Sequence, residues 1–94
     1  MPLYKVVIEG RGVETLVDDS LAVLGFVTTR WLRANGPKAA EREGLALVWR
    51  ELHARRVVLN SDGSPPELAV EEICKAGEMP SVQPGFAWYP DEPC

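Results

Sequence analysis

The side chains that could carry metal or nucleophilic chemistry are few in this chain. A zinc site needs three or four soft or imidazole ligands. The sequence offers His53 as its one histidine, with the widely spaced Cys74 and Cys94 and no C-x-x-C pair. His53 falls at the edge of a predicted helix face, where a surface histidine is more typical than a general base. We therefore expect no metal, no cofactor and no catalytic residue, and two free thiols in preference to a Cys74–Cys94 disulfide.

Three further patterns are similar to functional motifs but favour ordinary structure. Gly10-Arg11-Gly12 begins a G-x-G-x-x-G pattern. Thr15 replaces the third glycine, however, and extended residues follow, which favours a β-bulge over a dinucleotide site. Asp18-Asp19 lacks the alternating ligands of a calcium loop and predicts a turn. Glu71-Glu72 would point to opposite faces of a regular strand, which argues against an acid–base pair.

A first patch that could bind a partner lies at the end of a predicted strand, within residues 28–33. Arg30 shares one strand face with Thr28 and Leu32, whereas Trp31 and Arg33 share the opposite face. Whichever face is buried, an arginine lies on it or close to its edge. Such a guanidinium either pairs with a local carboxylate or aromatic ring, or binds an anionic partner through two hydrogen bonds.

A second patch is the aromatic group Phe86, Trp88 and Tyr89, which lies between prolines near the C-terminus. These side chains either cover a sheet edge of their own subunit or anchor another chain, because large aromatics dominate interface hot spots. The predicted interaction residues are therefore those of the two patches together: Arg30, Trp31, Arg33, Phe86, Trp88 and Tyr89.

The first half of the sequence predicts a long, bent antiparallel hairpin followed by a helix. Leu3–Gly10 and Val13–Val17 read as extended, with the glycine pair between them as a bend, and Leu21–Ala34 reads as the second strand. Pro37 suits the first position of a helix that runs to about His53. Its apolar residues fall on one broad face, namely Ala40, Gly44, Leu45, Leu47, Val48, Trp49 and Leu52.

The second half predicts a strand and a proline-rich tail. Val57–Leu59 is either a short strand or the buried exit of the helix, and Asn60–Pro66 is a loop. Glu67–Lys75 predicts a third strand with a bulge or a helical turn, and Phe86–Trp88 predicts a short edge strand within a tail of residues 80–94. We therefore expect a single α+β domain over residues 1–94. Its antiparallel sheet has three or four strands and carries one amphipathic helix, in the order β-β-α-β with a possible final β.

Charge and hydropathy narrow the class of partner. The net charge of −4 disfavours nucleic acid as a partner. The sequence has no run of about 20 apolar residues and no signal-like start, so we expect neither a membrane span nor export. We therefore expect a cytoplasmic protein. Residues 1–57 hold nine basic and seven acidic side chains, whereas residues 58–94 hold one basic and seven acidic. This asymmetry either aids solubility or guides head-to-tail association or a basic-faced partner.

The motif G-F-x-T-T-R at residues 25–30, followed by Trp31, Ala34, the helix that Pro37 begins and the Pro84-Gly85-Phe86 tail, resembles a group of short bacterial proteins of no assigned function. That resemblance implies no particular activity. In layout alone, the hairpin, helix and further strand are also similar to HicB-type antitoxin domains, which bind a toxin and self-associate. The first of these resemblances implies a bacterial protein.

We expect a protein–protein interaction or assembly module, including a homodimer formed through a sheet edge or the aromatic tail. The alternative is a binder of a small anion, or a minor enzyme, that uses a pocket between the helix and the hairpin. There Arg30 and Arg33 would attract the anion and His53 would move a proton.

Overall fold

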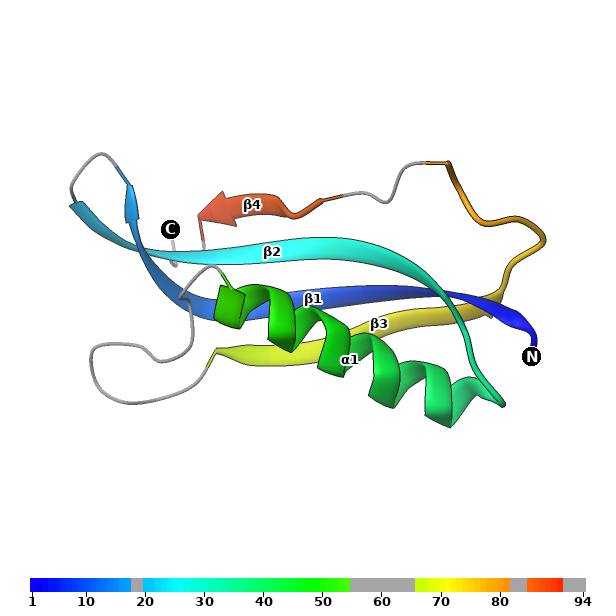
Figure 1. The fold of residues 1–94 in the computed structure, drawn as a ribbon. Helices are drawn as coiled ribbons and strands as arrows, with labels where there is room; N and C mark the ends of the chain where they lie inside the picture. Colours follow the sequence, from blue (N-terminus) through cyan, green and yellow to red (C-terminus); the bar gives the residue numbers. More distant parts are fainter. Residues whose placement is uncertain (18–19, 55–65, 82–84, 91–94) are drawn as a thin grey trace.

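The described residues fold into one antiparallel sheet of four strands with a single helix against one face (Figure 1). The computed structural model describes residues 1–17, 20–54, 66–81 and 85–90. The strand order is β3-β1-β2-β4. The elements are β1 (Leu3–Val17), β2 (Ser20–Arg33), α1 (Pro37–Ala54), β3 (Glu67–Lys75) and β4 (Ala87–Pro90). The predicted α+β class and the order β-β-α-β are confirmed, with the final strand present.

The centre of the sheet is the predicted hairpin of β1 and β2. Its register runs from the pair Leu3 and Arg33 to the pair Val17 and Ser20. One irregularity falls between Gly10 and Val13, where Gly12 has a φ of 66°. That left-handed conformation costs little for glycine. The predicted bulge is therefore confirmed, and it joins the two predicted extended segments into one continuous strand.

The helix α1 covers the hairpin and β3 on one side, and the core lies between them. Its small residue Gly44 allows close approach, because a Cβ there would lie 3.3 Å from Val6 and 3.4 Å from Ile8. The helix contacts β1 and β3 more extensively than β2. The buried face matches the predicted apolar stripe and consists of Ala40, Gly44, Val48 and Leu52. The strands contribute Tyr4, Val6, Ile8, Val13 and Phe26 to the same core.

The two edge strands come from the second half of the chain. β3 pairs with β1, and β4 pairs with β2 at residues 24–27. The register of β3 shifts opposite Val7 and Ile8, which leaves Glu71 as the extra residue of a bulge. The predicted third strand is thus confirmed with a bulge and not a helical turn. Asp18-Asp19, Val57–Leu59, residues 60–65 of the predicted loop and Cys94 lie outside the described residues.

None of the helices in the described part of the chain combines the length and hydrophobicity that a membrane crossing requires.

Candidate interaction surface

Arg30, from the first patch, points to the helix side of the sheet and is bound within the chain. It pairs with Val6 across the hairpin, and Val6 belongs to the core. Arg30 is only 5% exposed, and its Nη2 donates to Oε2 of Glu51 on α1 at 2.5 Å. Its guanidinium also lies 5.4 Å from the ring centroid of Phe86. The structure therefore shows the local pairing with a carboxylate and an aromatic ring, which was one of the two alternatives open from the sequence.

Two of the tail aromatics lie on the same side of the sheet and cover the core of their own subunit. The centroids of Phe86 and Trp88 lie 4.9 and 5.2 Å from that of the buried Phe26, in edge-to-face geometry. The Thr28 hydroxyl donates to the Gly85 carbonyl at 3.1 Å, which holds the chain just before β4 against β2. Phe86 and Trp88 therefore contribute first to the packing of this subunit.

The other three predicted interaction residues, Trp31, Arg33 and Tyr89, belong to the opposite face, which we call the open face. No described helix or strand lies on it, because α1 packs on the other side (Figure 1). The open face is formed by alternate residues of each strand. From β1 these are Leu3, Lys5, Val7, Glu9, Arg11 and Glu14, of which Leu3 is buried, and from β2 Val23, Gly25, Val27, Thr29, Trp31 and Arg33. From β3 they are Glu67, Ala69, Glu72 and Cys74, and from β4 Ala87 and Tyr89.

The apolar part of the open face lies along β2. Val23 and Val27 are each 37% exposed, which places them among the most exposed large hydrophobic residues described. Trp31 follows on the same face and is half-buried. Arg33, at the strand end, is exposed and donates from Nη1 to the Met1 carbonyl at 3.1 Å. Trp31 and Val27 therefore form an apolar strip next to charged residues, which is the usual arrangement of an interface core and its edge.

A hydrogen-bonded carboxylate lies beside this strip. Glu9 accepts from Arg11 Nε at 2.8 Å and from the Tyr89 hydroxyl at 2.9 Å. The pKa of Glu9 is lowered to about 2, most strongly by the hydrogen bond from Glu71 and next by those from Arg11 and Tyr89. The pKa of Glu71 is raised, because it donates its proton to Glu9 and faces the negative charge there. The arrangement keeps Glu9 ionised on the open face and favours the protonated form of Glu71.

This cluster was not predicted from the sequence. Two residues apart on one strand, Glu9 and Arg11 could have been recognised as neighbours. In a regular strand, Glu71 and Glu72 would point to opposite faces, as the sequence predicted. The β3 bulge breaks this alternation, and Glu71 therefore reaches Glu9. Tyr89 reaches Glu9 because its ring lies over Gly25, where a Cβ would be 2.6 Å from the ring.

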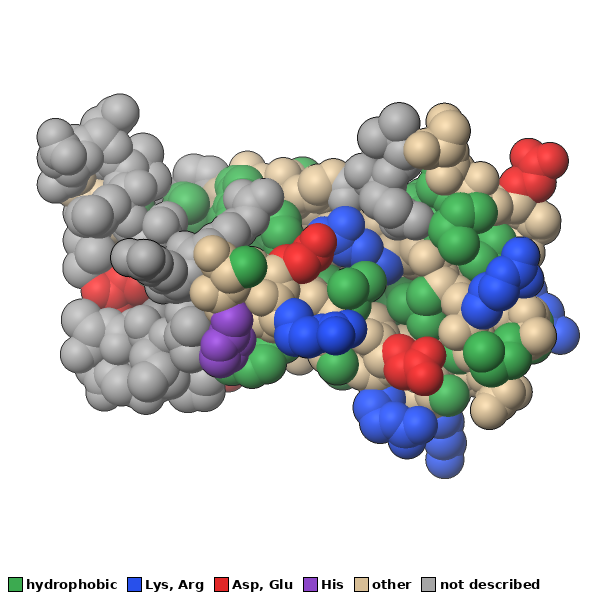
Figure 2. All heavy atoms as spheres, viewed as in Figure 1, with side chains coloured by type: hydrophobic (Ala, Val, Ile, Leu, Met, Phe, Trp, Pro, Cys, Tyr) green, Lys and Arg blue, Asp and Glu red, His purple; other side chains and the backbone are tan. Residues whose placement is uncertain are grey.

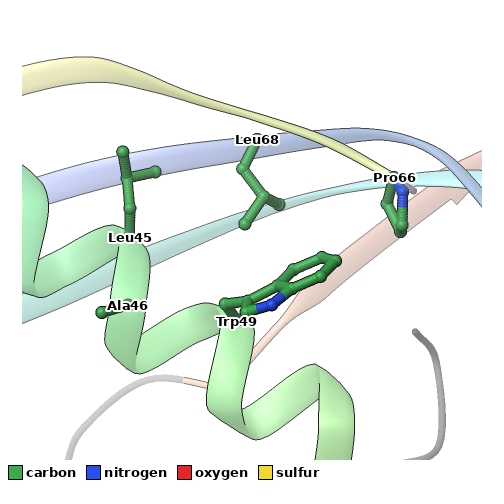
Figure 3. A pocket seen from close by; sticks show the side chains of 5 residues that line it. All are labelled: Leu45, Ala46, Trp49, Pro66 and Leu68. Carbon is green, nitrogen blue, oxygen red and sulfur yellow. The ribbon is translucent and has the colours of Figure 1, made fainter. Parts of the chain in front are cut away.

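A shallow groove opens between α1 and β3, not between α1 and the hairpin (Figure 3). Its volume is about 380 Å³, and its lining consists of Leu45, Ala46, Trp49, Pro66 and Leu68. None of these side chains is charged. His53 is exposed and stacks edge-to-face on Trp49, with centroids 4.9 Å apart.

The helix side also carries charges of both signs. Figure 2 shows basic and acidic side chains interspersed with hydrophobic ones over α1, without a field of one sign. Within the described residues, no group of three histidine, cysteine or carboxylate side chains is arranged to hold a metal. Cys74 is a free, exposed thiol on the open face.

Comparison of the chain with protein-family models, with curated proteins and with solved structures gives no match.

Proposed function

We propose that this protein is a protein–protein interaction module that binds its partner through the open face of its sheet. The observation that carries the proposal is the position of Trp31 and Val27, which face away from the only described helix and stay partly exposed. A sheet that packs a helix on one face and carries apolar side chains on the other has surface left to bury.

The composition of the open face supports a protein as the partner. Tryptophan and tyrosine are enriched at the centre of protein interfaces, and a polar, solvent-accessible rim surrounds it. Trp31 and Tyr89 lie on the open face with Lys5, Glu9 and Glu72 beside them. The carboxylates of this face and the net charge of −4 do not suit a phosphate backbone.

We also propose that the module acts in the bacterial cytoplasm. The free, exposed thiol of Cys74 supports this location, because exposed unpaired cysteines are typical of reducing compartments.

Site-specific photo-crosslinking tests the proposal without assuming the partner. A benzophenone amino acid replaces Val27 on the open face and, as a matched control, Arg50, which is exposed on α1. After irradiation of producing cells, we expect discrete protein adducts from position 27 and none from position 50. Equal labelling from both positions, or no adduct from position 27 in a folded protein, would contradict the proposal.

A further inference from the structure

We propose that the occupant of the open face is a second copy of this chain. The two copies pack sheet against sheet, related by a two-fold axis that runs across the strands. This inference rests on the proposed function and adds the identity and orientation of the partner. It differs from pairing through a sheet edge or the aromatic tail, which the sequence alone favoured.

The side-chain pattern of the hairpin is self-complementary about one point. Val7 of β1 is the register partner of Thr29 of β2. On β1, Lys5 and Glu9 lie two residues on either side of Val7. A two-fold axis that crosses the strands at this point reverses their direction in the second copy. It therefore places Lys5 of each copy over Glu9 of the other, and Val7 over Val7.

The neighbouring strand shows the same complementarity with apolar side chains. Trp31 and Val27 lie two residues on either side of Thr29, and they are the register partners of Lys5 and Glu9. The same axis therefore places Trp31 of each copy over the exposed Val27 of the other. The contact has two Trp–Val pairs on β2 and two Lys–Glu pairs on β1, which is the self-complementary pattern that an isologous interface requires.

The chemistry of the charged pair suits this contact. Glu9 is held ionised by the hydrogen bonds from Arg11 and Tyr89. Its carboxylate is therefore a fixed acceptor, so Glu9 loses little further side-chain entropy when Lys5 of the second copy approaches, and only the Lys5 side chain has to be ordered. An axis parallel to the strands would instead place Glu9 over Val27, and burying a charge against an apolar side chain is unfavourable.

The area of the open face suits a weak, reversible dimer. The strands β1, β2 and β3 at ~4.8 Å spacing and the eight β1 residues of the β1–β3 ladder at ~3.4 Å rise give a face of about 14 by 27 Å, since β4 pairs only with residues 24–27 at one end. The projected area is roughly 400 Å² for each copy and about 800 Å² in total, which is in the range of weak, transient interfaces. Stacked sheets commonly pack in this way, with their strands within about 30° of each other.

One residue opposes the contact and supplies a diagnostic. Glu72 is the β3 partner of Val7, so the same axis brings it towards Glu72 of the second copy. Like charges at that position weaken association. We therefore expect the overlap to be centred on β1 and β2, and we expect Glu72→Gln to tighten the dimer.

Sedimentation of the purified full chain over low to high micromolar concentration tests the inference. We expect a monomer–dimer equilibrium that Lys5→Glu weakens by at least about tenfold, since the substitution acts twice in a symmetric interface. Glu9→Lys should weaken it similarly, and Lys5→Glu combined with Glu9→Lys should restore most of the affinity. Val7→Arg should abolish the dimer, whereas Ala54→Arg, at an exposed position on α1, should leave it unchanged.

Thermal unfolding by circular dichroism shows whether each variant folds. If Glu9→Lys does not fold, Lys5→Glu alone tests the charged pair. A dimer that is insensitive to Lys5→Glu and Val7→Arg would overturn the inference. A monomer at every concentration would also overturn it. In that case the proposed function survives if the photo-adduct from position 27 contains a different protein, and it fails as well if no adduct forms.

Discussion

Gly10→Ala should be among the most destabilising single-methyl additions to this protein. Gly10 faces Phe26 across the hairpin, and a Cβ at Gly10 would lie 2.7 Å from Cδ2 of the Phe26 ring and closer still to Cε2 and Cζ. The ring itself must therefore move. Phe26 is 0% exposed, and Phe86 and Trp88 pack edge-to-face against it with centroids 4.9 and 5.2 Å away.

The expected loss is near the upper end of the range for overpacked cores. Such changes cost about 1–3 kcal/mol, and the absence of free space around Phe26 places Gly10→Ala at about 3 kcal/mol. For a domain of this size, that free energy corresponds to a fall in Tm of roughly 12–24 °C. Gly77→Ala is the matched control, because a Cβ at Gly77 meets nothing within 4 Å. We expect Gly77→Ala to change stability by less than about 0.5 kcal/mol.

Urea unfolding followed by tryptophan fluorescence and circular dichroism measures both variants. A double-mutant cycle with Phe26→Leu isolates the contact, since the smaller side chain makes room for the added methyl group. The double variant should be more stable than the sum of the single losses predicts, by at least about 1 kcal/mol. A Gly10→Ala protein within about 0.5 kcal/mol of the parent, or strictly additive losses, would refute the reasoning.

Three further predictions concern charge and backbone. Glu51→Gln should cost about 1–2 kcal/mol in urea unfolding. It weakens the hydrogen bond to the buried Arg30, but Glu51 is 42% exposed and water replaces part of the loss. Glu71→Gln should raise Tm at pH 7, and the gain should vanish near pH 4. The raised pKa of Glu71 means that folding favours its protonated form, so its contribution is present below its ordinary pKa of 4.5 and is lost as pH rises; a gain that grows on acidification would contradict this. Gly12→Ala should cost about 1 kcal/mol because its φ is 66°, and an unchanged urea midpoint would exclude that strain.

The fold followed from local patterns that tertiary contacts did not override. Alternation over Leu3–Gly10, the glycine pair at the bulge and the proline at the start of the helix each have one dominant structural reading. The helix was predicted to within one residue of its observed end at Ala54. The final strand was predicted to begin one residue early and to end two residues early, because proline and aromatic content locates an edge strand without fixing its bounds.

The faces of the sheet could not be assigned in the same way. Alternation shows that Arg30 and Trp31 lie on opposite faces, but not which face meets the helix. That choice depends on the hairpin register, which pairs Arg30 with the buried Val6. The Glu9–Glu71 contact depends in addition on the bulge in β3. Sequence periodicity does not show at which residue a strand has a bulge.

The strand order has a consequence for how this protein folds during synthesis. β1 and β2 are adjacent in the chain and form the centre of the sheet, whereas β3 and β4 arrive later on its two edges. A hairpin forms within about 1–10 μs. A ribosome that adds about 5–20 residues per second takes roughly 3–11 s to proceed from Arg33 to Pro90. Throughout that time the nascent hairpin carries unpaired backbone groups at residues 24–27 of β2 and an uncovered Phe26. Aggregation through this edge is therefore a folding hazard of the chain in that interval, and a chaperone that binds extended apolar segments would protect it.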